Sequence, residues 1–367
     1  MTEEYKALMA RLKDVAPRTY QTQTVLTAVE KLTSTHSSLM IELPTGSGKT
    51  ITGLSIVALV AQKLGYTRIG WSCMRRDLLL QASRECAQKN FPIEIIPISM
   101  FASSAPEVDI LVIDEAHHDA TKSMAHIHKI TNPKKTLGLS ATPYRPDGAE
   151  LLFEEFVSKY GIRELIRQGY IAKPDHYTIS DWTPADVTDT YLRDPERFGK
   201  SVMYFTTLVD CHEACGILQK AGISTEVISA STDRERQLAE FASGYLKVLV
   251  NVGILTEGFD SPDLETVFAR PTGSSILSTQ MAGRVLRIHP GLNKKIVECS
   301  RNSFPFTAVA DARNQYLWVE TEKTWKQQNP DHAQILKTIR NADTHCIRKI
   351  IPERSMLEIK MLKDSRG

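Results

Sequence analysis

The stretch PTGSGKT, at Pro44–Thr50, lies between the apolar segment LMIEL (39–43) and the helix-like segment ITGLSIVALVAQKLG (51–65). A glycine-rich loop that joins a buried strand to a helix suits phosphate binding, because its backbone N–H groups and the helix N-terminus supply positive potential. A chance glycine-rich turn is the alternative, and the strand before the loop and the helix after it argue against it. The sequence therefore predicts a phosphate-binding loop.

The residues of this loop have distinct predicted roles. Gly46 and Gly48 let the backbone approach the phosphates closely. Lys49 is expected to reach the β- and γ-phosphates of a nucleoside triphosphate, and the Thr50 hydroxyl is expected to bind Mg²⁺. Thr45 and Ser47 complete the predicted nucleotide-binding set in the loop.

A second polar motif, LVIDEAHH at 111–118, places two carboxylates at the end of an apolar stretch. Parallel sheets bind ligands at the carboxyl ends of their strands. We expect Asp114 to hold Mg²⁺ and Glu115 to polarise the attacking water as a general base. A solvated turn is the alternative for the two carboxylates. His117 is assigned a coupling role, and His118 is interpreted as a cap.

Short apolar stretches alternate with amphipathic helical patterns over two runs of the chain, 17–165 and 199–310. This alternation predicts parallel sheets that are covered by helices on both faces. We therefore predict an α/β protein with two tandem parallel-sheet domains and a short C-terminal extension. The expected strands are 39–43, 67–73, 93–99, 109–116 and 136–143 in the first run, and 201–207, 224–230, 246–252, 265–271 and 293–300 in the second.

We place the first domain at 1–177 and the second at 201–310. The segment 178–200 is polar, contains two prolines and has no clear period, so it is interpreted as an interdomain linker. The extension, 311–367, has helix-like stretches at 314–327 and 333–342, and its role is not assigned. We interpret its tryptophans as core residues packed on the second domain. The alternative is a strand-separating wedge made by Trp318, Trp325, Arg348, Lys349 and Arg354.

Composition excludes few classes of protein. The 367 residues are 42% hydrophobic and 24% charged, with a net charge of +2, which is ordinary for a globular protein. No apolar run is long enough to span a bilayer, and the charged N-terminus lacks the apolar core of a signal peptide. We therefore expect a cytoplasmic, nucleoid-associated protein, or one in the host cytoplasm if a phage encodes it.

The six cysteines are scattered along the chain, which argues against a disulfide framework. Cys211 and Cys215, with His212 between them, raise the alternative of a metal site. No second pair of ligands follows at zinc spacing, so we interpret DCHEACGILQKAG (210–222) as one amphipathic helix that ends at Gly222.

These motifs, in this order, resemble those of the superfamily 2 helicases with a DEAH-type second motif, over about residues 17–300. The resemblance implies two RecA-like domains. It implies that Arg18, Tyr20 and Gln21 recognise adenine, and that Ser140 and Thr142, in SATP, couple hydrolysis to nucleic-acid binding. MRRDLLLQ (74–81) resembles a nucleic-acid-contacting motif and implies a phosphate contact by Arg75, although Met74 stands where the family usually has proline.

The second domain carries the remaining family motifs. VMYFTT (202–207) and VNVGILTEGFDSP (250–262) resemble motifs IV and V, and QMAGRVLR (280–287) resembles motif VI. By this resemblance Thr206 and Thr256 contact nucleic acid, and Gly258 and Asp260 lie at the nucleotide. Gln280, Arg284 and Arg287 are assigned to catalysis, the two arginines as fingers, because a guanidinium fork neutralises charge that develops on the γ-phosphoryl group. A surface helix with two arginines is the alternative.

The resemblance implies an ATP- and Mg²⁺-dependent helicase or translocase, and it is closest to the branch that holds restriction-type translocases, XPB-like and RadD-like helicases. That branch implies DNA, single-stranded or branched, as the partner, 3′-to-5′ tracking, a monomer, and single-strand-binding, repair or replication proteins as further partners. A duplex translocase without unwinding, an RNA helicase and a scaffold with a decayed motor remain as alternatives. The filled positions Lys49, Asp114, Glu115, Arg284 and Arg287 argue against decay.

Overall fold

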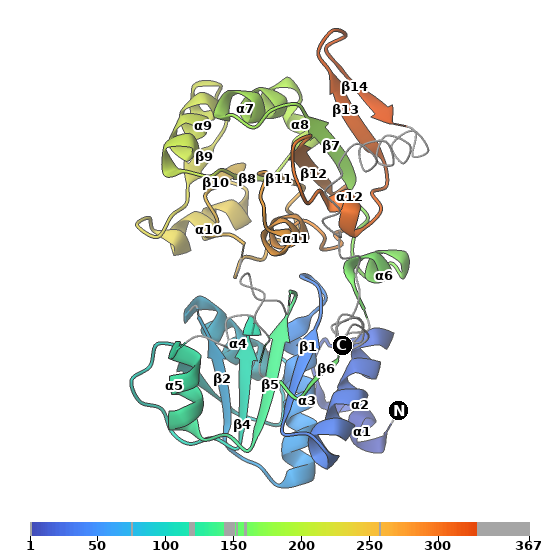
Figure 1. Ribbon diagram of the computed structural model, residues 1–367, viewed down its shortest axis with the longest axis vertical. Helices are drawn as coiled ribbons and strands as arrows, with labels where there is room; N and C mark the ends of the chain where they lie inside the picture. The colour runs from blue at the N-terminus through green and yellow to red at the C-terminus, as the bar shows by residue number, and fades with distance from the viewer. Residues whose placement is uncertain are drawn as a thin grey trace, which may run out of the picture. The chain divides into compact units, whose positions relative to one another are not determined.

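The computed structural model describes residues 2–74, 76–116, 122–142, 151, 153–157, 160–256 and 258–328. The chain divides into two compact units, with the boundary between Gly161 and Ile162. Each unit is an α/β domain built on a mostly parallel sheet (Figure 1). Within the described residues, no helix is long and apolar enough to cross a membrane.

The first unit contains a parallel sheet in the order β3-β2-β4-β5-β1-β6. The strands are β1 (Ser38–Glu42), β2 (Ile69–Cys73), β3 (Ile95–Ser99), β4 (Ile110–Asp114), β5 (Lys135–Ser140) and β6 (Glu155–Val157). Five of them coincide with the strands that the sequence predicts. Their side chains are mainly branched and apolar, which suits strands that are buried on both faces.

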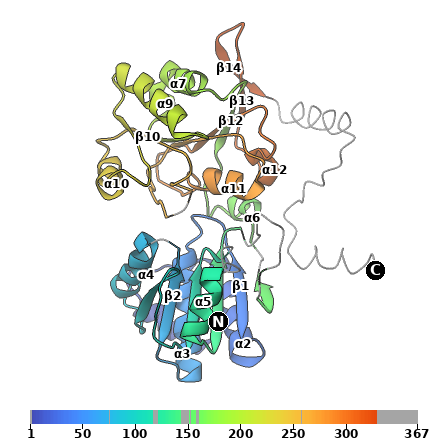
Figure 2. The same ribbon diagram turned by 60° about the vertical axis from the view of Figure 1, so that its left-hand side comes forward.

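Helices cover both faces of this sheet (Figures 1 and 2). On one face Met124 and Ile127 pack against Met40, Leu111 and Ile113 of the strands. On the other face α3 contacts β4 and β5. The helices are α1 (Glu3–Arg11), α2 (Thr19–Ser34), α3 (Lys49–Leu64), α4 (Arg76–Gln88) and α5 (Lys122–Thr131).

The second unit contains a sheet in the order β14-β13-β7-β12-β11-β8-β10-β9, in which only the β13–β14 pair is antiparallel. The strands are β7 (Asp175–Ile179), β8 (Ser201–Tyr204), β9 (Thr225–Val227), β10 (Val248–Asn251), β11 (Thr266–Ala269), β12 (Lys295–Cys299), β13 (Gln315–Val319) and β14 (Thr324–Gln328). The helices are α6 (Ile162–Arg167), α7 (Pro184–Arg193), α8 (Pro195–Phe198), α9 (Leu208–Lys220), α10 (Arg234–Ser243), α11 (Ser275–Gly283) and α12 (Phe306–Val309).

The predicted linker, 178–200, is wrong: these residues belong to the second unit. The prolines begin helices instead of breaking structure, because proline fits the first helical turn. Thr183 caps α7 ahead of Pro184, and Asp194 caps α8 ahead of Pro195. Val187 and Tyr191 then join the core of the unit. The first unit also ends before the predicted boundary at 177, because β7 pairs with β12.

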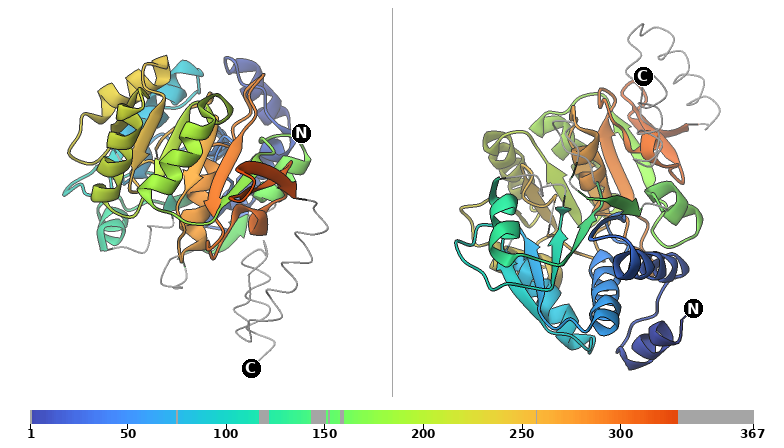
Figure 3. Two further views of the ribbon diagram at one scale, coloured as in Figure 1. Left: turned by 90° about the horizontal axis from the view of Figure 1, so that it is seen from above. Right: turned by 60° about the horizontal axis from the view of Figure 1, so that its bottom comes forward.

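The predicted helix over 314–327 is also wrong, because this segment forms the β13–β14 hairpin (Figure 3). The sequence predicts the tryptophans of this segment to be core residues; both pack on the second unit but are only partly buried. Trp325 packs edge-on against Tyr177, with ring centroids 4.9 Å apart, and Trp318 packs on Trp325 at 5.3 Å. The predicted stretch 333–342 and the basic residues of the proposed wedge lie outside the described residues.

A buried polar network supports the loop ahead of α11. The Glu298 carboxylate is 1% exposed and accepts hydrogen bonds from Asn302 Nδ2 at 3.1 Å and from the Phe306 N–H at 2.9 Å. Its second oxygen also lies 2.7 Å from His176 Nε2. Asn302 Oδ1 in turn accepts from the Thr272 N–H at 3.4 Å. This network links β12 to the segment that leads into α11.

We expect Glu298→Ala to lower the free energy of unfolding by about 3–5 kcal/mol, because it leaves several buried polar groups without their partner. Chemical denaturation followed by circular dichroism measures this loss. Glu322→Ala is the matched control, because Glu322 and Lys326 form an exposed pair that should contribute about 0–1 kcal/mol. Equal losses in the two variants would contradict the structural role of Glu298.

Candidate active site

The carboxyl edge of the first sheet brings three predicted motifs together. The neighbouring strands β4, β5 and β1 end at Asp114, Ser140 and Glu42, where Glu42 pairs with Ser140 and Asp114 pairs with Leu139. The Leu43 N–H donates to the Ser140 carbonyl at 3.0 Å, which joins the start of the phosphate loop to the segment after β5. Segments that are far apart in sequence therefore meet at one edge, as parallel strands require.

The phosphate loop has the left-handed backbone that its glycines allow. Gly46 and Gly48 both have φ of +79°. The backbone angle therefore favours glycine at position 48, and a Cβ there would also lie 2.6 Å from Gln21 Nε2 and displace that amide. The Ser47 hydroxyl donates to the Pro44 carbonyl at 2.6 Å and closes the loop. Helix α3 begins at Lys49, so its N-terminus directly follows the loop. Thr45 and Thr50 are half-buried.

Lys49 and Glu115 face each other across this loop. Lys49 Nζ lies 3.3 Å from Glu115 Oε1, and the two side chains are 13% and 9% exposed. Glu115 has φ of +54°, a left-handed conformation that is uncommon for a residue other than glycine and recurs at functional sites. Its N–H donates to Asp114 Oδ1 at 3.0 Å. The structure thus places the predicted general base beside the predicted phosphate ligand.

The N-cap and first turn of α2 are hydrogen-bonded to the phosphate loop. Gln21 Nε2 donates to the Ser47 carbonyl at 3.0 Å, and the Tyr20 hydroxyl donates to the same carbonyl. Arg18 Nη1 donates to the Tyr20 hydroxyl at 3.1 Å, and the Arg18 N–H donates to Gln21 Oε1 at 3.0 Å. The structure therefore joins the three residues of the predicted adenine segment to the phosphate loop, and their contact with a base remains a proposal.

Of the other predicted residues of the first unit, the structure describes Ser140 and Thr142 but not His117 or Arg75. The Thr142 N–H donates to Ser140 Oγ at 3.0 Å, and both residues are buried in the turn after β5.

Several side chains of the second unit bind backbone carbonyls of its predicted motif V, residues 250–262, and Lys294 Nζ donates to the Pro262 carbonyl at 2.7 Å. The Tyr204 hydroxyl donates to the Leu255 carbonyl at 3.0 Å, and Arg234 Nη2 donates to the Gly258 carbonyl at 3.1 Å. Arg284 Nη1 donates to the Phe259 carbonyl at 2.9 Å, and its Nη2 donates to the Thr256 carbonyl. Sequence reasoning missed Tyr204 and Arg234, because their partners are backbone carbonyls that no motif displays.

The two predicted arginine fingers differ in their surroundings. Arg284 is committed to backbone carbonyls of motif V. Arg287 Nη1 instead lies 2.6 Å from Asp260 Oδ2, and both of these side chains are 41% exposed. Gln280, on α11, is 6% exposed. An exposed ion pair exchanges partners more readily than a fork that is bonded to the backbone, so Arg287 is better placed to engage a phosphate.

The two threonines that we predict to contact nucleic acid also differ. Thr206 is exposed, immediately after β8. Thr256 is 8% exposed, and its hydroxyl donates to the Gly253 carbonyl at 2.6 Å. The Thr256 hydroxyl is thus turned into its own loop, and both contacts remain predictions.

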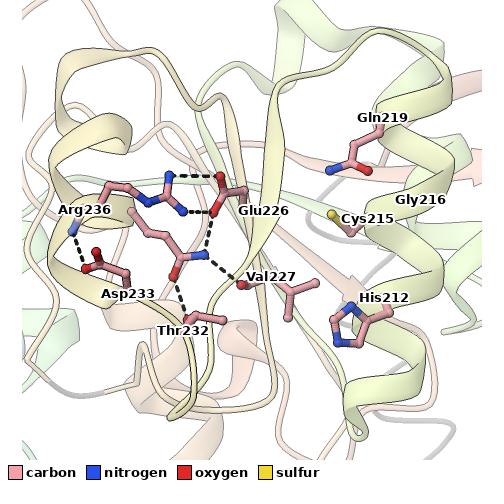
Figure 4. A pocket seen from close by; sticks show the side chains of 10 residues that line it. His212, Cys215, Gly216, Gln219, Glu226, Val227, Thr232, Asp233 and Arg236 are labelled. Atoms are coloured by element: carbon pink, nitrogen blue, oxygen red, sulfur yellow. Dashed lines mark hydrogen bonds and ion pairs between the residues drawn. The ribbon is translucent and has the colours of Figure 1, made fainter.

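A polar hollow of about 450 Å³ lies between α9 and α10, and His212 and Cys215 of the metal alternative are among its lining residues (Figure 4). Its charges are matched internally, because Arg236 is bonded to both carboxylate oxygens of Glu226 at 3.1 and 2.7 Å. The Gln219 and Gln237 amides donate to carbonyls of the edge strand β9 at 3.0 and 2.9 Å. The side chains around this hollow therefore have a structural role, because they bind carbonyls of an edge strand that would otherwise be open to pairing.

The proposed Cys211–His212–Cys215 metal alternative fits the structure poorly. Cys211 and Cys215 are buried on the core face of α9, and burial raises the pKa of the Cys211 thiol to about 12. A thiol with such a pKa is a poor source of the thiolate that binds metal. Over the part of the chain that the structure describes, no cluster of three such ligands is found.

The phosphate loop and the carboxylates beside it place the first unit in the class of P-loop nucleotide-binding proteins. Residues 14–94 and 100–145 match the family described as Type III restriction enzyme, res subunit. Residues 185–289 match the helicase conserved C-terminal domain, which begins within the segment that was predicted as a linker.

Known proteins agree with these matches. The Saccharomyces cerevisiae protein described as putative ATP-dependent helicase IRC3 is 25% identical over 343 residues, which span 74% of this chain and 49% of that protein. The DNA-bound Type ISP restriction-modification enzyme LlaBIII superposes with a TM-score of 0.58 and 15% identity, over 82% of this chain and 29% of that one. Mss116p bound to single-stranded RNA and AMP-PNP superposes with a TM-score of 0.62 and 15% identity, over 95% and 85%.

The matched regions span between 45% and 64% of the length of the curated relatives. These relatives therefore extend beyond the region that matches this chain. The structural likenesses support the two RecA-like folds. The two family matches support assigning this chain to the superfamily 2 helicases of restriction type.

Proposed function

We propose that this chain is a DNA-directed motor that hydrolyses ATP to translocate along DNA or to separate its strands. The observation that carries the proposal is the position of Glu115, held 3.3 Å from Lys49 at the mouth of a phosphate loop. A base beside a phosphate ligand is the pair that hydrolysis of a triphosphate needs.

The residues at the loop fit a nucleoside triphosphate with Mg²⁺. The left-handed glycines and the start of α3 direct backbone N–H groups toward a phosphate chain. Lys49 would neutralise the β- and γ-phosphates, and Arg18, Tyr20 and Gln21 would contact the base. Thr50 and Asp114 would hold Mg²⁺, which stabilises charge on the phosphate oxygens.

Hydrolysis in this proposal depends on the second unit. Arg287, and Arg284 through its hold on motif V, would complete the site with Gln280, Gly258 and Asp260. A guanidinium that engages the γ-phosphoryl group would stabilise the negative charge that develops there during hydrolysis. His117, Ser140 and Thr142 would couple hydrolysis to nucleic-acid binding.

DNA is the proposed substrate because the restriction-type family matches the first unit and the DNA-bound LlaBIII shares the fold. Arg75, Thr206 and Thr256 would contact phosphates, so little sequence preference is expected. We propose 3′-to-5′ movement by a monomer, with single-strand-binding, repair or replication proteins as partners. The RNA-bound Mss116p supports RNA as the second candidate substrate.

The test is the rate of ATP hydrolysis alone and with single-stranded DNA, duplex DNA, forked DNA and RNA. We expect strong stimulation by DNA, and its loss in Lys49→Ala. Stimulation by RNA alone would transfer the proposal to an RNA helicase. No stimulation by any nucleic acid would overturn the motor. A strand-displacement assay then separates unwinding from translocation.

A further inference from the structure

Phe101 is an aromatic side chain that the fold directs into solvent. It is 67% exposed, whereas its neighbour Met100 is 3% exposed and belongs to the core of the first unit. The Phe101 N–H donates to Ser99 Oγ at 3.2 Å, and the Ala102 N–H donates to the Ser99 carbonyl at 2.9 Å. The turn is therefore fixed, and the exposure of Phe101 is a consequence of this fixed backbone.

The place of Phe101 in the fold is the functional edge of the sheet. It follows the carboxyl end of β3, beside β2, and the Met100 N–H donates to the Cys73 carbonyl at 3.3 Å. Cys73 is the last residue of β2 and precedes the segment 74–81, which the family resemblance assigns to nucleic-acid contact. The phosphate loop and Glu115 lie at the same edge of this sheet.

Single exposed apolar residues are common on protein surfaces, so exposure alone does not indicate a binding site. The position of the residue in the fold must supply the argument. Among the large hydrophobic side chains of the described residues, three are more than half exposed: Phe101 at 67%, Tyr245 at 71% and Val209 at 75%. Tyr245 precedes β10 and so lies at the opposite, amino edge of its sheet. Phe101 is the aromatic residue of the three at a carboxyl edge.

We propose that Phe101 is a base-stacking residue for the single strand that the motor tracks. The ligand is an unpaired base of any kind, because every base presents a π-face and stacking carries little sequence preference. Phosphate contacts would hold the backbone of the strand, and Phe101 would engage one base beside the segment 74–81. This assignment rests on the proposed function.

The experiment measures binding of a fluorescein-labelled oligothymidine by anisotropy, for the wild-type protein, Phe101→Ala and Phe101→Trp. Loss of one stacking contact should weaken binding by Phe101→Ala about 5- to 150-fold. Phe101→Trp should retain binding within about threefold. The dependence of affinity on salt should not change, because the number of phosphate contacts is unaltered. Tyr245→Ala removes a similarly exposed aromatic ring from the amino edge of the second unit's sheet. This variant should bind like the wild type.

An abasic strand of the same length separates stacking from other causes. It keeps its phosphates, so it should bind wild type and Phe101→Ala equally, and the effect of the substitution should vanish. A loss that persists on the abasic strand, a drop in melting temperature that explains the loss, or binding of Phe101→Ala within twofold of the wild type would overturn the assignment. If the wild type binds no nucleic acid, the proposed function fails and this assignment fails with it. If the wild type binds and only the Phe101 prediction fails, the motor stands.

Discussion

Replacing Glu115 with glutamine is expected to lower nucleic-acid-stimulated ATP hydrolysis by roughly 10²–10⁴-fold, the usual contribution of a general base. The amide keeps the size of the side chain and leaves Lys49 in place, but it cannot accept a proton from the attacking water. Nucleotide binding should therefore persist. Steady-state hydrolysis with the best stimulating nucleic acid, together with binding of a fluorescent ATP analogue, measures the two effects separately.

Glu30→Gln is the matched control, because Glu30 is an exposed carboxylate of the same unit, on α2. It should hydrolyse ATP at the wild-type rate. Glu115 has φ of +54°, so the melting temperature of each variant must also be recorded. If Glu115→Gln keeps more than a tenth of the activity, or loses nucleotide binding together with hydrolysis, another group is the base.

The sequence predicts the core of the first unit well, because the signals there are local. A run such as ILVID at Ile110–Asp114 is apolar on both faces and ends in a carboxylate, so strand and site residue can be identified together. The phosphate loop likewise carries its own signal in glycine, lysine and threonine. The location of the site then follows from the rule that ligands bind at the carboxyl ends of parallel strands.

The second unit is predicted less well, because several of its features depend on distant partners. The strand β7 becomes part of this sheet by pairing with β12 and β13, which follow it by a long stretch of chain. The β13–β14 hairpin has aromatic residues whose spacing also suits a helix, and their packing on Tyr177 decides the outcome. Local periodicity does not contain this information.

The candidate site shows the same division. Residue types that react, such as Lys49 and Glu115, are visible in motifs. Residues that hold the backbone, such as Tyr204 and Arg234, are not, because a carbonyl acceptor is present at every position of the chain. The same limit hid the bonds of Arg284, which the sequence presents only as the first arginine of GRVLR.

Arg287→Ala is expected to reduce the catalytic rate by about 10³-fold or more, the scale measured for arginine fingers. The second unit should remain as stable as in the wild type, because the Arg287–Asp260 pair is 41% exposed and such pairs contribute about 0–1 kcal/mol. Arg287→Lys should not restore the rate, since an ammonium group lacks the fork that engages a phosphoryl group bidentately.

Arg284→Ala should differ from Arg287→Ala in stability as well as in rate. It removes hydrogen bonds from the charged guanidinium to the carbonyls of Phe259 and Thr256, so the second unit should lose about 1.5–3 kcal/mol. Arg236→Ala is the control, because the Arg236 guanidinium is bonded to the carboxylates of Glu226 and Glu240 instead of to carbonyls of motif V. Steady-state kinetics and thermal denaturation of the three variants distinguish the roles. Equal loss of stability in Arg284→Ala and Arg287→Ala, or full activity in Arg287→Ala, would show that the exposed arginine is not the finger.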